Sequence, residues 1–131
     1  MPDKVVYDTR FFIEYFYSSN KSDLDRLSDN LIHTKKRIIS TVTLYEVYKL
    51  VLSREGREVA RHRIEIIRRD FQVNDVTPEV AINAAEINHR TGNPMADCVI
   101  ASTAQIEKAT VITDDPHFEK IKNIKTQWPI R

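Results

Sequence analysis

The alternation of short β-branched segments with longer helical ones constrains the fold most strongly. The apolar segments are brief and do not alternate with polar residues, which is typical of parallel strands covered on both faces. We expect strands at residues 4–8, 37–40, 71–75, 109–113 and 124–128. Apolar residues at helical spacing predict helices at residues 11–18, 22–33, 42–55, 57–70, 78–91 and 94–107. This alternation predicts a doubly wound α/β fold with a parallel sheet.

The composition limits the class of protein. The length of 131 residues suits one domain, and no repeat or Gly/Ser-rich linker divides it, so we expect a single domain over residues 1–131. The two glycines, Gly56 and Gly92, cannot form a dinucleotide fingerprint or a P-loop. The single cysteine, Cys98, excludes an internal disulfide and a C-x-x-C zinc pair.

The charge and hydropathy of the chain bear on its partners and location. Twenty Lys and Arg residues against nineteen Asp and Glu residues leave a net charge of +1, so nucleic-acid binding would depend on a local patch. No apolar run is long enough to span a bilayer, and the first residues, MPDKVVYD, lack the apolar stretch of a signal peptide. We therefore expect a cytoplasmic protein that makes no membrane contact.

Four acidic residues occupy positions that local structure alone could explain. Asp8 closes the first expected strand and can cap the helix after it. Glu46 ends the segment TLYE, which has the pattern of a capping box. Asp97 lies in the first turn of a helix that Asn93 would cap, where the helix dipole favours a negative charge. Asp115 precedes a proline at a helix start and can also act as a cap.

The same four acids have a second explanation, because all strands of an open parallel sheet end at one edge. Asp8 and Asp115 follow strands, and Glu46 and Asp97 lie near the starts of helices. Four carboxylates within about 5 Å of each other would repel by roughly 3 kcal/mol per pair at an effective dielectric constant near 20. Such a cluster would take up either protons or a cation.

A hard divalent cation is the natural counter-ion for such a cluster, since the chain offers no set of soft ligands there. Mg²⁺ or Mn²⁺ is favoured over Ca²⁺, because these ions bind a few carboxylates and keep waters for chemistry. Water held by such an ion is a better nucleophile, and the ion also neutralises a phosphate under attack. The residues therefore predict phosphodiester hydrolysis, with simple helix capping as the alternative.

The order of these motifs resembles the PIN-domain ribonucleases, and most closely the VapC-type toxins of bacterial and archaeal toxin–antitoxin pairs. The resemblance covers essentially the whole chain and implies a three-layer α/β/α fold with a five-stranded parallel sheet. It also implies an endoribonuclease that depends on Mg²⁺ or Mn²⁺, frequent homodimers, and a cognate antitoxin that silences the toxin. The matching segments are VVYDT, STVTLYE, PMADCVIASTA and VITDDPHF.

The resemblance also implies roles for individual residues. Asp8, Asp97 and Asp115 would chiefly hold the metal ion, and Glu46, also in the cluster, would position the attacking water or accept its proton. RNA would be the substrate, and the products would carry 5′-phosphate and 3′-hydroxyl ends. The hydroxyls expected beside the first and last acids belong to Thr9 and Thr113.

The chain departs from the family pattern at one position. Many members carry another acid two places after the fourth, where this chain has His117. A four-acid centre remains unless Asp114 contributes a further carboxylate. We therefore expect one firmly held ion, with a second ion arriving only with the substrate phosphate.

Basic residues near the acids have two interpretations. Arg10 lies two residues after Asp8, and Lys49 lies one helical turn after Glu46. Each could contact a substrate phosphate or neutralise an acid, and neutralisation is the favoured interpretation.

Two further features suggest function less strongly. The segment at residues 53–70 has six arginines but also four acids, and Glu65 stands four residues before Arg69 as a helical ion pair, so a solvated face is favoured over RNA binding. The four histidines share no helical spacing, so a histidine metal site is not expected. The aromatic segment at residues 11–18 predicts core packing for Phe11, Phe12 and Phe16, and a surface for another chain at Tyr15 or Tyr17.

These observations favour a metal-dependent PIN-type endoribonuclease that acts as the toxin of a toxin–antitoxin pair. One alternative is a PIN nuclease that works in RNA processing or on DNA without an antitoxin. The other is a catalytically idle α/β module that uses the same groove to hold a partner.

Overall fold

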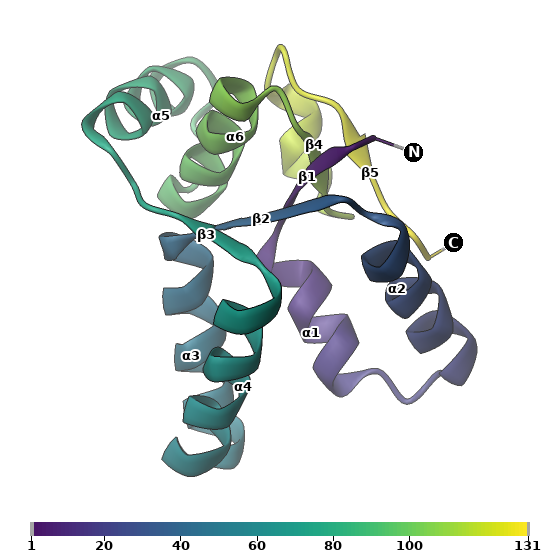
Figure 1. The fold of residues 1–131 in the computed structure, drawn as a ribbon. Helices are drawn as coiled ribbons and strands as arrows, with labels where there is room; N and C mark the ends of the chain where they lie inside the picture. The colour runs from purple at the N-terminus through teal and green to yellow at the C-terminus, as the bar shows by residue number, and fades with distance from the viewer. Residues whose placement is uncertain (1, 131) are drawn as a thin grey trace.

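The computed structural model describes residues 2–130 as a parallel sheet between layers of helices (Figure 1). The five strands are ordered β3-β2-β1-β4-β5, and every neighbouring pair is parallel. The predicted three-layer α/β/α fold is therefore confirmed, while residues 1 and 131 of the predicted domain lie outside the described part. The strands are β1 (Lys4–Tyr7), β2 (Lys36–Ser40), β3 (Gln72–Asn74), β4 (Thr110–Ile112) and β5 (Thr126–Gln127).

All six predicted helices are present, with ends within two residues of the expected positions. A short 3₁₀ helix, η1 (Pro116–Lys120), follows β4 and begins at the proline that was expected to start a helix. No helix within residues 2–130 is both long and apolar enough to cross a membrane. The helices are α1 (Thr9–Tyr17), α2 (Lys21–His33), α3 (Thr41–Glu55), α4 (Arg57–Asp70), α5 (Pro78–Thr91) and α6 (Met95–Glu107).

Two apolar cores lie on the two faces of the sheet. Successive side chains of a strand point to opposite faces, so Val6 of β1 packs with α5, α6 and η1, while Val5 and Tyr7 pack with α1 to α4. Figure 1 shows α5 and α6 on one side of the sheet and α1 to α4 on the other. Because β1 is the central strand and is buried on both faces, the residue that follows it is held firmly in place.

The aromatic segment of α1 divides between core and surface. Phe11 and Phe12 are buried, which confirms their predicted core role, and Phe16 packs partly buried against the same core. Tyr15 stays 36% exposed and stacks on Phe11, with ring centroids 5.8 Å apart. Tyr17 donates a hydrogen bond to Glu55 over 2.8 Å. Of the two tyrosines considered for contact with another chain, Tyr15 has the freer ring.

A buried polar network joins β1 to α2. The hydroxyl of Tyr7 donates to Asn30 Oδ1 over 2.7 Å and lies 3.3 Å from the hydroxyl of Thr34. Burial raises the pKa of Tyr7 to about 12, so the phenol stays protonated and serves as a donor. The network therefore ties β1 to a residue of α2 that lies 23 residues later in the chain.

We predict that Tyr7→Phe lowers the free energy of unfolding by about 1–2 kcal/mol, because the buried acceptor of Asn30 loses its donor. The matched control is Tyr45→Phe, whose ring is 61% exposed and whose loss of a hydroxyl should change stability by less than about 0.5 kcal/mol. Urea denaturation of the two variants measures both values. Equal effects of the two substitutions would contradict the structural role given to the Tyr7 hydroxyl.

Candidate metal centre

Asp8 lies at the carboxyl end of the central strand and is 4% exposed. Its Oδ1 accepts a hydrogen bond from the Thr9 N–H over 2.8 Å, so the predicted N-cap of α1 is confirmed. Its Oδ2 accepts a hydrogen bond from the Thr113 hydroxyl over 2.7 Å. The pKa of Asp8 is raised to about 7, chiefly by burial and in addition by the carboxylates of Asp97 and Glu46, although these two donors act to lower it.

Glu46 does not form the predicted capping box. Helix α3 begins directly after β2, and its N-cap is Ser40, whose hydroxyl accepts from the Val42 N–H over 3.2 Å. Glu46 therefore lies in the second turn, beyond reach of the helix start. Its Oε1 instead accepts a hydrogen bond from the Thr9 hydroxyl over 2.6 Å. This contact holds the carboxylate of α3 against the residue next to Asp8.

Asp97 lies in the first turn of α6, as predicted, but Asn93 is not the cap of that helix. The helix begins at Met95, so Pro94 occupies the cap position and Asn93 lies one residue too early. The side chain of Asn93 turns inward and donates to the backbone carbonyl of His117 over 2.8 Å. The pKa of Asp97 is raised to about 6, chiefly by burial and in addition by the carboxylates of Asp115 and Glu46, while His117 acts to lower it.

Asp115 caps η1, as the sequence predicts. Its Oδ1 accepts from the His117 N–H over 2.9 Å, and its own N–H donates to the Thr113 hydroxyl over 3.0 Å. The same Oδ1 lies 2.8 Å from Nδ1 of the His117 ring. The side chains of Asp97, Asp115 and His117 each offer a ligand atom, and these atoms lie within 4.8 Å of one another.

His117 is the residue at this edge that the sequence interpretation missed. The four histidines share no helical spacing with one another, so their spacing does not indicate a histidine ligand. The available signal was local, because an aspartate that caps a helix brings the side chain two residues later close to its own carboxylate. The pattern Asp-Pro-His at residues 115–117 contains that signal.

The four predicted acids therefore meet at one edge of the sheet. Electrostatic interactions link Asp8 to Asp97 and Glu46, and link Asp97 to Asp115 and Glu46. The closest group of possible ligands is that of Asp97, Asp115 and His117, whereas Asp8 and Glu46 are held by the threonine hydroxyls. Geometry alone does not assign a role to each acid, so the roles remain predictions.

The two basic residues near the acids differ in their contacts. Arg10 forms a two-point ion pair with Asp114, with N–O distances of 2.9 and 3.2 Å. Arg10 thus neutralises an acid, and Asp114 directs both oxygens to it. Lys49 places its Nζ 5.9 Å from the ring centroid of Tyr45. Lys49 forms no ion pair within the described residues, which leaves it available near Glu46.

Comparison with known proteins assigns the chain to a family. The model of the PIN domain matches residues 5–124. The chain belongs to the PIN domain family. No curated protein is similar enough in sequence to match significantly.

Solved structures with the same fold include toxins and toxin–antitoxin complexes. The DNA-bound VapBC of Salmonella typhimurium is 23% identical, with 97% of this PIN domain and 98% of that chain covered and a TM-score of 0.78. A toxin–antitoxin complex from Klebsiella pneumoniae is 18% identical, with 98% of this PIN domain and 99% of that chain covered and a TM-score of 0.75. VapC20 of Mycobacterium tuberculosis, a sarcin-ricin loop cleaving toxin, is 18% identical, with 88% of this PIN domain and 93% of that chain covered and a TM-score of 0.75.

The donor set of this PIN domain fits a divalent cation. The group of Asp97, Asp115 and His117 supplies carboxylate oxygens and one imidazole, and Asp8 and Glu46 add carboxylates beside it. The pKa values of Asp8 and Asp97 are raised first by burial and then by the neighbouring carboxylates, so both effects disfavour negative charge at this edge in the absence of a cation. A bound cation would offset that charge directly.

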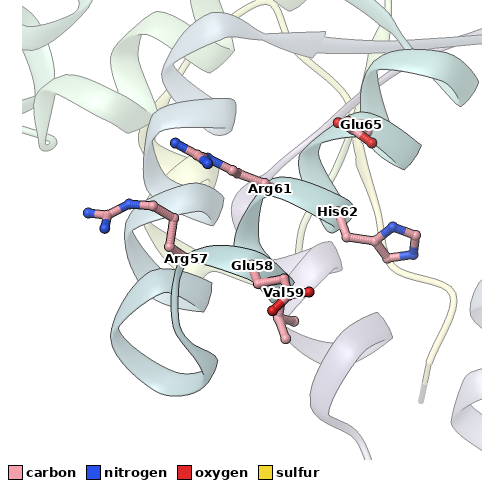
Figure 2. A pocket seen from close by; sticks show the side chains of 6 residues that line it. All are labelled: Arg57, Glu58, Val59, Arg61, His62 and Glu65. Atoms are coloured by element: carbon pink, nitrogen blue, oxygen red, sulfur yellow. The ribbon is translucent and has the colours of Figure 1, made fainter.

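The arginine-rich helix α4 carries none of the four acids. A hollow of about 760 Å³ is lined by six residues of α4, with none of the four acids among them. Figure 2 shows Arg57 and Arg61 extending to one side of the helix and His62 to the other. The predicted ion pair of Glu65 with Arg69 is wrong, because Arg69 pairs with the adjacent Asp70 at 2.9 Å.

We predict that the metal-free protein loses stability as the pH rises from about 4 to about 7. In this window folded Asp8 and Asp97 retain protons that the unfolded chain has released, because their pKa values are raised to about 7 and about 6. Asp97→Asn removes part of this cost and should raise the free energy of unfolding by about 1 kcal/mol at pH 8, a value discounted for partial exposure.

Urea denaturation in EDTA at pH 4, 6 and 8 measures this dependence for the wild type and for Asp97→Asn. The difference in stability between the two proteins should be smallest at pH 4, because folded Asp97 is protonated there and the unfolded carboxyl has lost only part of its proton population. A variant that is less stable than the wild type at pH 8 would show instead that Asp97 serves to stabilise the helix start.

Proposed function

We propose that this PIN domain is an endoribonuclease that depends on Mg²⁺ or Mn²⁺ and acts as the toxin of a toxin–antitoxin pair. The observation that carries the proposal is the meeting of Asp8, Glu46, Asp97 and Asp115 at the carboxyl edge of the sheet, with two pKa values raised by burial and mutual repulsion. Membership of the PIN domain family supports the same conclusion. An idle module would have no need of this unfavourable arrangement.

The metal ion in this proposal is held chiefly by Asp8, Asp97 and Asp115. When bound, a Mg²⁺ or Mn²⁺ ion lowers the pKa of a water ligand and neutralises charge on the phosphate under attack. The protein contributes fixed oxygen atoms for that purpose. The Thr113 hydroxyl orients Asp8, and the N–H of His117 orients Asp115.

Glu46 is the residue we assign to the attacking water. Its Oε1 is occupied by the Thr9 hydroxyl at 2.6 Å, which fixes the carboxylate beside the end of β1. The second oxygen of the same carboxylate can then accept a proton or orient a water molecule. Arg10 is taken up by Asp114, so Lys49 is the better candidate for a phosphate contact.

RNA as substrate and an antitoxin as partner are supported by similar structures. One of them is a toxin–antitoxin complex, and another is a toxin that cleaves the sarcin-ricin loop. By the same family resemblance we propose that the protein acts in the cytoplasm and forms homodimers. The structure also leaves several large apolar side chains exposed, among them Ile82 and Met95, which a partner chain could cover.

We predict that the purified protein cleaves total cellular RNA in the presence of Mn²⁺ and that EDTA stops the reaction. Asp8→Asn and Asp97→Asn should each reduce the cleavage rate by at least about 100-fold, because each removes a charged oxygen ligand. The matched control is Asp29→Asn, an exposed acid on α2, which should retain full activity. Mapping of 5′-phosphate ends identifies the cleavage sites.

Equal activity of the wild type and Asp97→Asn would contradict the proposal. Cleavage that persists in EDTA would contradict the metal requirement. Loss of activity in Asp29→Asn would indicate general misfolding of the variants, whereas activity that persists in Asp8→Asn would indicate a contaminating nuclease.

We predict that a small protein encoded beside this gene forms a stable complex with the chain and prevents growth arrest when both are expressed. Size-exclusion chromatography with light scattering measures the complex and also the mass of the toxin alone, which should be that of a dimer. A neighbour that fails to bind would favour the alternative of a PIN nuclease without an antitoxin, whereas growth arrest that requires no RNA cleavage would favour the catalytically idle module.

A further inference from the structure

The ring of His117 lies at the candidate metal centre although the family pattern would place an acid there. A ligand atom of His117 lies within 4.8 Å of ligand atoms of Asp97 and Asp115. Its Nδ1 is 2.8 Å from Oδ1 of Asp115. This position gives the centre a nitrogen donor beside its carboxylates.

The backbone of His117 is held from two sides, which fixes the point from which its half-exposed ring extends. The N–H of His117 donates to Asp115 Oδ1 over 2.9 Å, and its carbonyl accepts from Asn93 Nδ2 over 2.8 Å. Asn93 is only 2% exposed and lies two residues before the first residue of α6. The hydrogen bond from Asn93 therefore joins η1 to the segment that leads into α6, the helix that carries Asp97.

The spacing of these atoms suits ligands of one ion. Metal–ligand distances of about 2.1 Å place two adjacent ligands of an octahedral ion about 3 Å apart and two opposite ligands about 4.2 Å apart. The contact of 2.8 Å between His117 and Asp115 already matches adjacent ligands. The ligand atoms of Asp97, Asp115 and His117 all lie within 4.8 Å of one another. Small side-chain movements would therefore bring all three to the distances that one ion requires.

We propose that His117 is a direct ligand of the divalent cation and that its nitrogen makes this centre prefer Mn²⁺ over Mg²⁺. Mg²⁺ favours oxygen ligands and water, whereas first-row transition metals bind imidazole more readily. The inference rests on the proposed function for the presence of the ion. The competing role for His117 is a hydrogen bond to Asp115 without any contact to metal.

Calorimetric titration of the full-length protein with Mn²⁺ alone and with Mg²⁺ alone tests the inference, with no RNA present. His117→Ala should weaken Mn²⁺ binding by about 10-fold or more while leaving Mg²⁺ binding nearly unchanged. His117→Asp should strengthen Mg²⁺ binding and so reduce the preference for Mn²⁺. The matched control is His62→Ala, an exposed histidine of α4, a helix that carries none of the four acids, and it should change neither affinity (Figure 2).

Co²⁺ provides a direct spectroscopic readout of the imidazole. A Co²⁺-bound histidine gives a strongly shifted ring N–H proton signal that exchanges with solvent, and this signal should be present in the wild type and absent in His117→Ala. The ring of His117 is 57% exposed, so its replacement does not disturb the core. Alanine and aspartate at position 117 both keep the backbone N–H that donates a hydrogen bond to Asp115, so the variants should fold.

The outcomes separate this inference from the proposed function. Mn²⁺ binding that His117→Ala leaves unchanged, with the Co²⁺ signal retained, overturns the role of His117 and leaves the nuclease proposal standing. Absence of any Mn²⁺ or Mg²⁺ binding by the wild type overturns both. Weaker Mn²⁺ binding in His117→Ala with loss of the Co²⁺ signal supports direct ligation.

Discussion

Burial of the Asp8 carboxylate at the end of the central strand is the constraint on which the rest of the centre depends. Burial disfavours the charged form and is the main reason that the pKa of Asp8 is raised to about 7. The carboxylate is retained there because the Thr9 N–H and the Thr113 hydroxyl each donate to it. These two donors belong to α1 and to the segment after β4, so the same contacts that satisfy Asp8 also bring the neighbouring acids into position.

The centre combines charge repulsion with firm geometric support. Glu46 and Asp97 come from helices on opposite faces of the sheet, and both act on the buried Asp8. The fold tolerates their mutual repulsion because two apolar cores hold the helices that carry them. Asp114, by contrast, is neutralised by Arg10 and adds little charge to the edge. A site that gives up stability in its metal-free form is the kind of site that gains most from a cation.

The strands and helices could be predicted because each leaves a local pattern. The core positions of Phe11 and Phe12 and the cap at Asp8 followed from the same reasoning. Three local expectations were wrong, the capping box at Glu46, the cap at Asn93 and an ion pair in α4. The first two failed because a helix boundary one to three residues away changes which backbone N–H is free. The third failed because Arg69 found a nearer carboxylate on Asp70.

The sequence by itself determined the alternation of strands and helices, and with it the edge at which the acids of a parallel sheet must end. Only the tertiary structure decided which hydroxyl donates to which acid, since the hydroxyl of Thr9 donates to Glu46 and that of Thr113 donates to Asp8. It also decided that a ligand atom of His117 lies within 4.8 Å of one of Asp97. The physical reason is that backbone pattern is local, whereas a side-chain contact between distant segments depends on how whole elements pack.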